Sequence, residues 1–133
     1  MLQDSSCCFG VGALQAPVLL ICQDFSKPLE TKKPVDGVVI ETVAVGATKC
    51  HRICCGMGWR WSKDIKPLIG GNSCQKHHLG YVTQGVFAVN MIEGDGKETN
   101  IEPGQTYDIP PGHDAWVVGN TEVIVIEFDQ PFI

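Results

Sequence analysis

Short runs of apolar and β-branched residues, separated by glycine or proline, recur along most of this 133-residue chain. The clearest run covers residues 38–45, in which valine and isoleucine predominate. Similar runs follow at residues 49–57, 80–83, 86–92, 98–101, 105–109, 115–119 and 122–128. Helical periodicity is nearly absent, and short strands at regular spacing are typical of a β-sandwich or β-barrel. We therefore predict an all-β fold of the barrel type.

The residues between these runs predict how some of the strands are connected. Gln84-Gly85 separates residues 80–83 from residues 86–92, which is the pattern of a β-hairpin. Glu93-Gly94-Asp95-Gly96 indicates a tight turn. The segment from Trp59 to Pro67 has no strand pattern, and we expect it to be a connection that leads into the next strand.

The N-terminal part of the chain has a different character, and we divide the chain into a tail at residues 1–34 and a barrel domain at residues 35–133. The tail holds an apolar run from Phe9 to Cys22. This run is about 14 residues long, whereas a membrane-spanning helix needs roughly 20. Two interpretations stay open: residues 17–22 pair as an edge strand, on this subunit or on a neighbouring one, or the tail is a loose terminus.

The charge and the cysteine content narrow the function classes. The 10 basic and 15 acidic side chains give a formal net charge of −5, and Lys32-Lys33 is the only adjacent basic pair, so nucleic acid is not expected as a partner. The 7 cysteines are an odd number, and the adjacent pairs Cys7-Cys8 and Cys54-Cys55 have poor geometry for disulfides. We predict a cytoplasmic protein with reduced thiols and no membrane span.

Side chains that bind transition metals gather in two places. One is the segment Cys74-Gln75-Lys76-His77-His78, and the other is His113, which follows a proline–glycine turn. Alternate residues of a strand share a face, so Cys74 and His78 point one way and His77 points the other. Inside a small barrel, Cys74, His78 and His113 would together hold a divalent transition metal (Zn, Fe, Ni or Mn) and leave one coordination position open.

Other arrangements of the same residues stay open. His113 can instead bond to the backbone, and Cys74 can simply pack in the core. A bulge near Cys74 would bring in His77 as a substitute ligand. Lys76 shares a face with Cys74 and His78; it is either solvated at the mouth of the barrel, or it anchors an anion or acts as an amine nucleophile.

A second group of ligand types lies in the segment Cys50-His51-x-x-Cys54-Cys55. On a strand, Cys50 and Cys54 share one face, while His51 and Cys55 share the other. The spacing fits no common zinc site. We expect a core strand in which cysteine acts as a small hydrophobic residue.

Aromatic and polar side chains near the two ligand segments are candidates for a small-molecule pocket. Such pockets are usually concave and apolar, with a few polar groups. Asp114 is expected to accept backbone N–H groups at the turn; the alternative is that it orients His113, as carboxylates often do for metal-bound imidazoles. The expected pocket residues are Trp61, Tyr81, Tyr107 and Arg60. For Arg60, which lies between two tryptophans, three roles stay open: it stacks on an aromatic ring, holds a carboxylate, or extends along the surface into solvent.

From about Asp24 to Asp129 the chain resembles the single-domain cupins, a superfamily of small double-stranded β-helix (jelly-roll) barrels. The second cupin motif has a glycine, five residues, Pro-x-Gly, two residues and a metal-binding histidine. Gly104, Pro110 and Gly112 match this frame without a gap, but the position of the histidine falls on Ala115.

The first cupin motif is matched less closely. It ends in a glutamate, six residues and a glycine, so counting back from Gly85 places His78 at the glutamate position. The two histidines that precede this glutamate in the family fall on Cys74 and Asn72. The resemblance therefore implies the cupin fold, together with an altered set of metal ligands.

The resemblance implies a barrel whose pocket holds a divalent metal and a small molecule. The reaction stays unassigned; oxidation or isomerisation of a small polar metabolite is one expectation. The alternative is a non-enzymatic binding or sensor cupin, with or without metal, because the ligand set departs from the family at His78 and Ala115. Cupins of this size also imply a homodimer, and the apolar N-terminal run would otherwise be an exposed patch.

Overall fold

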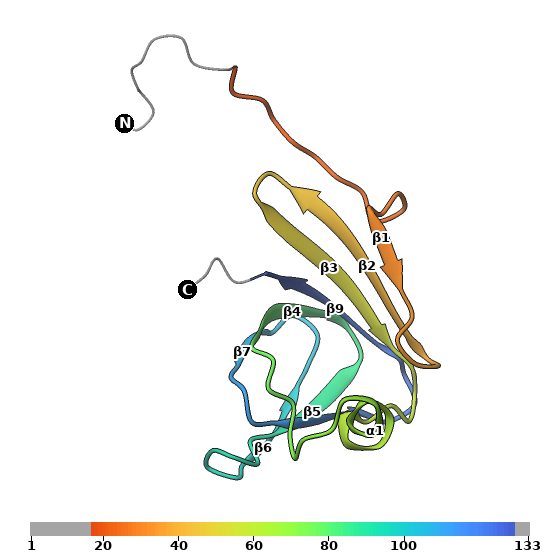
Figure 1. Cartoon of the computed structure of the whole chain (residues 1–133), viewed down its shortest axis with the longest axis vertical. Helices are drawn as coiled ribbons and strands as arrows, with labels where there is room; N and C mark the ends of the chain where they lie inside the picture. Colours follow the sequence, from red (N-terminus) through yellow and green to blue (C-terminus); the bar gives the residue numbers. More distant parts are fainter. Residues whose placement is uncertain (1–16, 130–133) are drawn as a thin grey trace.

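The structure is a computed structural model, and it describes residues 17–129. Two antiparallel sheets face each other and form a jelly-roll barrel (Figure 1). The larger sheet has the strand order β1-β2-β3-β9-β4-β7, and the smaller has the order β6-β5-β8. The strands are β1 (Glu30–Lys32), β2 (Val38–Val45), β3 (Thr48–Cys55), β4 (His78–Gln84), β5 (Val86–Asn90), β6 (Glu98–Ile101), β7 (Thr106–Ile109), β8 (Asp114–Val118) and β9 (Val123–Phe128).

The predicted all-β fold is confirmed. The runs at residues 38–45 and 98–101 coincide with β2 and β6, and the other predicted strands differ from the observed ones by one or two residues at their ends. Alternation explains this agreement, because each strand that faces the core on one side has apolar residues at every second position. In β9, for example, Val123 and Val125 are buried, whereas Ile124 between them is partly exposed.

The predicted hairpin across Gln84-Gly85 is wrong. β4 pairs with β7 and β9, whereas β5 pairs with β6 and β8, so the two strands belong to different sheets. Gly85 has φ = +79°, a conformation that residues with a side chain rarely adopt. The glycine therefore turns the chain from one sheet to the other instead of closing a two-stranded ribbon.

The connection that precedes β4 contains two short helical turns, η2 (Trp61–Ile65) and α1 (Lys66–Ile69). Asp114 of β8 holds their start, because one carboxylate oxygen accepts the backbone N–H of Ser62 at 3.0 Å and the other accepts its hydroxyl at 2.9 Å. Trp61 is buried at this end of the barrel. The sequence predicted a connection here, but no helix.

The N-terminal part of the described chain is an extended segment followed by the edge strand β1. Residues 17–22 form no strand, so the expected pairing of this segment is not found within the subunit. Instead β1 pairs with β2 and starts the larger sheet. The extended segment leads away from the barrel at the top of Figure 1. The first part of the apolar run, together with Cys7-Cys8, lies outside the described residues.

The core lies between the two sheets. Its buried members are Val82, Phe87, Val89, Ile101, Tyr107, Ile109, Ala115, Val117, Val123 and Val125. Val82 is fully buried, and the rings of Phe87 and Tyr107 pack edge to face with their centroids 5.4 Å apart. None of the helices in residues 17–129 is long and apolar enough to cross a membrane.

The segment from Cys50 to Cys55 lies in a strand of the larger sheet, as expected. Cys50 is buried opposite Val43 on the neighbouring strand. The ligand types of this segment do not converge: His51 bonds to Thr42 at 2.8 Å and to Asp129 at 2.7 Å. This segment therefore contributes to the sheet.

Candidate metal centre and pocket

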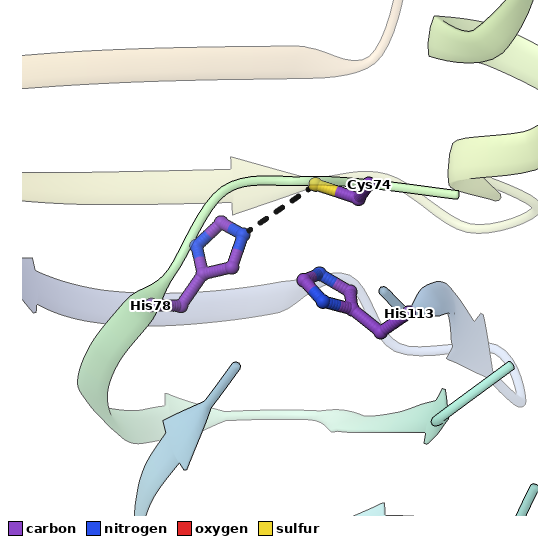
Figure 2. Close-up of side chains that lie close together, drawn as sticks. All are labelled: Cys74, His78 and His113. Carbon is purple, nitrogen blue, oxygen red and sulfur yellow. Dashed lines mark hydrogen bonds between the residues drawn. The ribbon is translucent and has the colours of Figure 1, made fainter. Parts of the chain in front are cut away.

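Cys74, His78 and His113 converge at one end of the barrel. Cys74 lies in the loop before β4, His78 is the first residue of β4, and His113 immediately precedes β8. Each offers one ligand atom, and the three atoms lie within 4.8 Å of one another. Figure 2 shows the three side chains pointing toward one another. The structure thus brings together the three residues that the sequence nominated as metal ligands.

The backbone fixes two of these residues next to each other. The backbone N–H of Cys74 donates to the carbonyl oxygen of His113 at 2.7 Å, and that of Gly112 donates to the carbonyl oxygen of Cys74 at 2.8 Å. This short antiparallel bridge has the Pro-x-Gly turn on one side. Gly112 has φ = +100°, which explains why the turn requires glycine. The distance between the two ligand loops is therefore set by hydrogen bonds of the main chain.

Hydrogen bonds also set the orientation of both imidazole rings. His113 Nδ1 lies 2.8 Å from the carbonyl oxygen of Pro110, and His78 Nδ1 lies 2.9 Å from Glu127 Oε1. A carbonyl or a carboxylate can only accept, so Nδ1 carries the hydrogen in both rings. This leaves Nε2 of each ring for a metal, and His78 Nε2 indeed lies 3.9 Å from the Cys74 sulfur.

Glu127 of β9 supports this arrangement through two hydrogen bonds, one of which is the bond to His78. Its second oxygen accepts the hydroxyl of Tyr107 at 2.7 Å, so the buried carboxylate bonds to two buried or half-buried partners. Burial alone would raise the pKa of Glu127, but the hydrogen bond and the charge of His78 outweigh burial and hold that pKa below its usual 4.5. Glu127 is therefore a carboxylate at neutral pH.

The charges of the group favour a cation. Burial is the largest single influence on Cys74 and disfavours the thiolate, but hydrogen bonds from His113 and His78 together lower the thiol pKa from 9.0 to about 6. Burial likewise disfavours the charged form of His78, yet the hydrogen bonds with Cys74 and Glu127 raise its pKa from 6.5 to about 9. Cys74 would offer a divalent metal a thiolate, and His78 would have to give up its proton to act as a ligand.

A cavity of about 300 Å³ adjoins the three ligands between the two sheets. The three candidate ligands, Lys76, Tyr107 and Glu127 form its polar part. The other walls are mainly apolar, and η2 and α1 contribute to them. The apolar lining is Pro34, Val38, Ile40, Ile53, Trp59, Trp61, Ile65, Ile69, Phe87, Ile109, Ala115, Val117, Val123 and Val125.

Two of the four expected pocket residues line this cavity, namely Trp61 and Tyr107. Tyr81 points out of the barrel and is 41% exposed. The guanidinium of Arg60 lies over the ring of Trp116, 4.2 Å from its centroid, on the outside of the barrel. Tyr81 and Arg60 are not among the side chains that line the cavity.

His77 and Asp114 were also candidates for the ligand group or for its support. His77 is not part of the group: its side chain contacts Asp108 on the exposed side of the segment. Asp114 accepts backbone N–H groups, as expected, from Ser62 at 3.0 Å and from Ala115 at 2.9 Å. Its carboxylate also accepts from the Ser62 hydroxyl and from Arg60, and it does not orient His113. The carbonyl of Pro110 takes that role instead.

Among solved structures, several resemble this chain, although no protein-family model and no curated protein matches it. KdgF from Halomonas sp. is 19% identical and matches 78% of this chain and 89% of its own, with a TM-score of 0.54. An RmlC-like cupin from Shewanella frigidimarina is 20% identical and matches 77% of this chain and 84% of its own, with a TM-score of 0.53. The fold is that of the cupins.

A third solved structure extends this comparison. The polyketide cyclase RemF from Streptomyces resistomycificus is 11% identical to this chain and has a TM-score of 0.58 over 86% of this chain and 83% of its own. At identities this low, the structural matches show a shared fold and no more. They do not transfer a reaction, because one fold carries many activities.

The residue that sequence reasoning missed is Glu127. It occupies an inward position of β9, two residues after Val125, and it is buried there. An acidic residue at an inward position of an otherwise apolar strand is costly unless it is paired. That break in the alternation was the available signal for a functional carboxylate.

Proposed function

We propose that this cupin binds a divalent transition metal through Cys74, His78 and His113 and holds a small molecule in the adjoining cavity. One observation carries the proposal: both imidazoles have Nδ1 engaged by fixed acceptors, so that their Nε2 atoms are available to a metal beside the thiolate. Carboxylate–histidine and carbonyl–histidine pairs of this kind are what metal-bound histidines usually have. Thiolate and imidazole suit Zn²⁺ or Fe²⁺ better than they suit Mg²⁺ or Ca²⁺.

Each group at the site would have a separate role. A metal held by three side chains supplies Lewis acidity at its remaining position when it is bound. Glu127 keeps His78 in one tautomer and orientation, and the Pro110 carbonyl does the same for His113. The apolar walls of the cavity lower the local dielectric, which strengthens electrostatic interactions with a bound molecule.

The test is the metal content of protein purified without a histidine tag. We expect about one transition metal per chain, either as purified or after reconstitution under reducing conditions. A chain that takes up no Zn²⁺, Fe²⁺, Ni²⁺ or Mn²⁺ under those conditions contradicts the proposal.

A non-enzymatic binding or sensor role is the second candidate, and Ala115 favours it. This residue stands where the cupin motif has a metal-binding histidine, and it lines the cavity as a methyl group. A sensor is expected to be stabilised by its ligand without turnover, by about 2.7 kcal/mol at a ligand concentration of 100 times Kd. A thermal-shift screen followed by product analysis of each stabilising compound separates the two roles.

Glu127→Gln is expected to weaken metal binding without unfolding the barrel. The amide oxygen can still accept from His78 Nδ1, but the negative charge that strengthens this imidazole as a ligand is lost. Loss of such a partner typically costs about ten- to a hundredfold in metal affinity. Competition for Zn²⁺ with a chromogenic chelator measures the change, and Glu122→Gln, an exposed acid just before the same strand, is the matched control. Equal affinities of Glu127→Gln and wild type would contradict the role of Glu127.

We further propose that the cupin is a homodimer joined through its N-terminal segment. Val18 is 96% exposed and Leu20 is 91% exposed, in an extended stretch that lies away from the barrel (Figure 1). Contiguous exposed apolar residues of this kind usually mark an interaction site. Light scattering after size exclusion should give twice the chain mass for wild type and one chain mass for Leu20→Asp. A monomeric wild type contradicts this proposal.

The thiols support a reducing location, and we propose the cytoplasm. The described cysteines are Cys22, Cys50, Cys54, Cys55 and Cys74, and all of them are free. A thiol can serve as a metal ligand only while it stays reduced.

A further inference from the structure

The turn between β5 and β6 contacts both loops that carry the candidate ligands Cys74 and His113. Glu93 lies in this turn, and its backbone N–H donates to the carbonyl oxygen of Gly112 at 2.9 Å. Gly112 is the residue before His113, so this bond fixes the start of that ligand's segment. The approach is close, because a Cβ added to Gly112 would lie 2.9 Å from the Cβ of Glu93. The main chain of Glu93 therefore holds the His113 side of the site.

The side chain of Glu93 holds the other ligand loop. Its carboxylate accepts a hydrogen bond from the hydroxyl of Ser73, a residue that is only 3% exposed. The side-chain amide of Gln75 donates to the same carboxylate oxygen at 3.3 Å and to the Ser73 hydroxyl oxygen at 2.8 Å. Ser73 and Gln75 are the residues directly before and after Cys74. One carboxylate thus bonds to both neighbours of the candidate thiolate ligand.

Glu93 itself is not a member of the ligand group. The group consists of Cys74, His78 and His113, and Glu93 does not line the cavity beside them. Its hydrogen bonds go to Ser73, to Gln75 and to the main chain of the turn before His113, and none goes to the Cys74 sulfur or to an imidazole. Its effect on the site must therefore pass through the positions of the two loops.

The Cys74 loop needs this support because of its composition. It follows α1 and begins with Gly70 and Gly71, both of which have positive φ. Glycine loses more conformational freedom on ordering than any other residue, so this loop has an unusually large entropy to lose. Bonds that order the loop in the metal-free chain reduce the ordering that metal binding must offset.

We propose that Glu93 is a positioning residue of the metal centre: it holds the loops of Cys74 and His113 in their ligand-binding arrangement before a metal arrives. This inference rests on the proposed function and deepens it, because it identifies the side chain that preorganises the site. Glu93 acts through its hydrogen bonds, and neither its charge nor direct ligation is required. A preorganised set of ligands binds more tightly than the same ligands on a mobile loop.

The experiment compares the Zn²⁺ affinity of Glu93→Ala with that of wild type by competition with a chromogenic chelator. We expect a loss of at least about fivefold, which is what the net contribution of one hydrogen bond corresponds to. Glu93→Gln should stay within about twofold of wild type, because its amide oxygen still accepts from the Ser73 hydroxyl. Glu98→Ala, which removes an exposed acid at the start of β6, is the matched control. Unchanged affinity in Glu93→Ala, or equal losses in Glu93→Ala and Glu93→Gln, would overturn the inference.

A second measurement uses the metal-free chain, so it reports on the loops themselves. After EDTA treatment, amide hydrogen exchange followed by NMR reports how often the bond from Cys74 N–H to the His113 carbonyl opens. Glu93→Ala should speed exchange of this amide at least about fivefold. The amide of Val117, which bonds to the carbonyl of Trp59, should exchange as in wild type. Faster exchange at both amides would show a general loss of stability and would contradict a positioning role.

Ser73→Ala identifies the bond through which Glu93 acts on the Cys74 loop. If the bond between Ser73 and Glu93 carries the effect, the double variant Ser73→Ala/Glu93→Ala should lose no more Zn²⁺ affinity than Glu93→Ala alone. Additive losses would show that the two residues act independently, and the inference would fail.

The wild-type chain separates this inference from the metal proposal. A wild type that binds no metal refutes the metal centre and the positioning role together. A wild type that binds one Zn²⁺, while Glu93→Ala binds it equally well, retains the metal centre and loses only the role of Glu93.

Discussion

Cys74→Ala is expected to abolish stoichiometric metal binding while the barrel stays folded. The thiolate is the only anionic ligand of the group, and the two imidazoles that remain cannot hold a divalent transition metal tightly on their own. The affinity should fall by more than the roughly hundredfold that loss of a supporting residue costs. Elemental analysis per chain, together with Zn²⁺ competition, measures the effect.

Two other variants of the same chain serve as controls for this experiment. Cys55→Ala removes a thiol that lines the same cavity but lies outside the ligand group, and burial raises its pKa to about 12, so that it is not a thiolate at neutral pH. His77→Ala removes the imidazole next to His78, whose side chain faces Asp108 instead. Both variants should keep the wild-type metal content. Metal retained by Cys74→Ala, or lost from Cys55→Ala, would place the site elsewhere.

Gly85→Ala should cost the barrel several kcal/mol of stability. Its φ of +79° disfavours any side chain, and an added Cβ would lie 2.5 Å from the carbonyl oxygen of Glu122 and 2.9 Å from the Cα of Val123. Both atoms belong to the backbone, so neither can rotate away. Strain at positive φ costs about 1–3 kcal/mol, and overpacking against fixed atoms costs about 1–3 kcal/mol more. Urea unfolding measures the sum as a shift in the midpoint at constant slope.

Gly104→Ala separates the two causes. Gly104 has φ = +90°, but an added Cβ would meet nothing within 4 Å. This variant should therefore show the conformational strain alone, and the difference between the two variants is the cost of the contact with the chain before β9. If Gly85→Ala and Gly104→Ala destabilise equally, the close approach between Gly85 and Glu122 does not exist in solution.

The strands of the barrel, and three residues that lie close together at its end, could be predicted from the sequence. Alternation places apolar residues of each strand on one face. Cys74 lies in the loop before β4, so its place in the group is fixed by its backbone bonds with the turn before β8 and not by strand alternation. The turn with Gly112 then brings the backbone of His113 beside that of Cys74. The alternation within each strand extends over a few residues, so a single sequence is enough to show it, whereas the bridge between Cys74 and His113 joins residues far apart in the chain.

The rest of the site depends on pairings between distant strands. The partner of His78 is Glu127, which lies 49 residues later and is adjacent only because β4 pairs with β9. The outward position of Tyr81 has the same origin, because its neighbour Gly80 faces Tyr107 inside the barrel. Sequence spacing does not reveal which strands become neighbours. The wrong hairpin across Gly85 is an error of this kind. The glycine indicates that the chain turns, but it does not indicate that the next strand belongs to the other sheet.

The position of the ligand group also has a mechanical consequence. Cys74 and His78 lead into β4 of the larger sheet, whereas His113 leads into β8 of the smaller one. A metal held by all three would crosslink the two sheets at the end of the barrel where the cavity lies. Since a complete site does not exist in the unfolded chain, its binding free energy adds to the free energy of folding. Removal of the metal would then lower the stability of this end of the barrel and also remove the Lewis acid from the site.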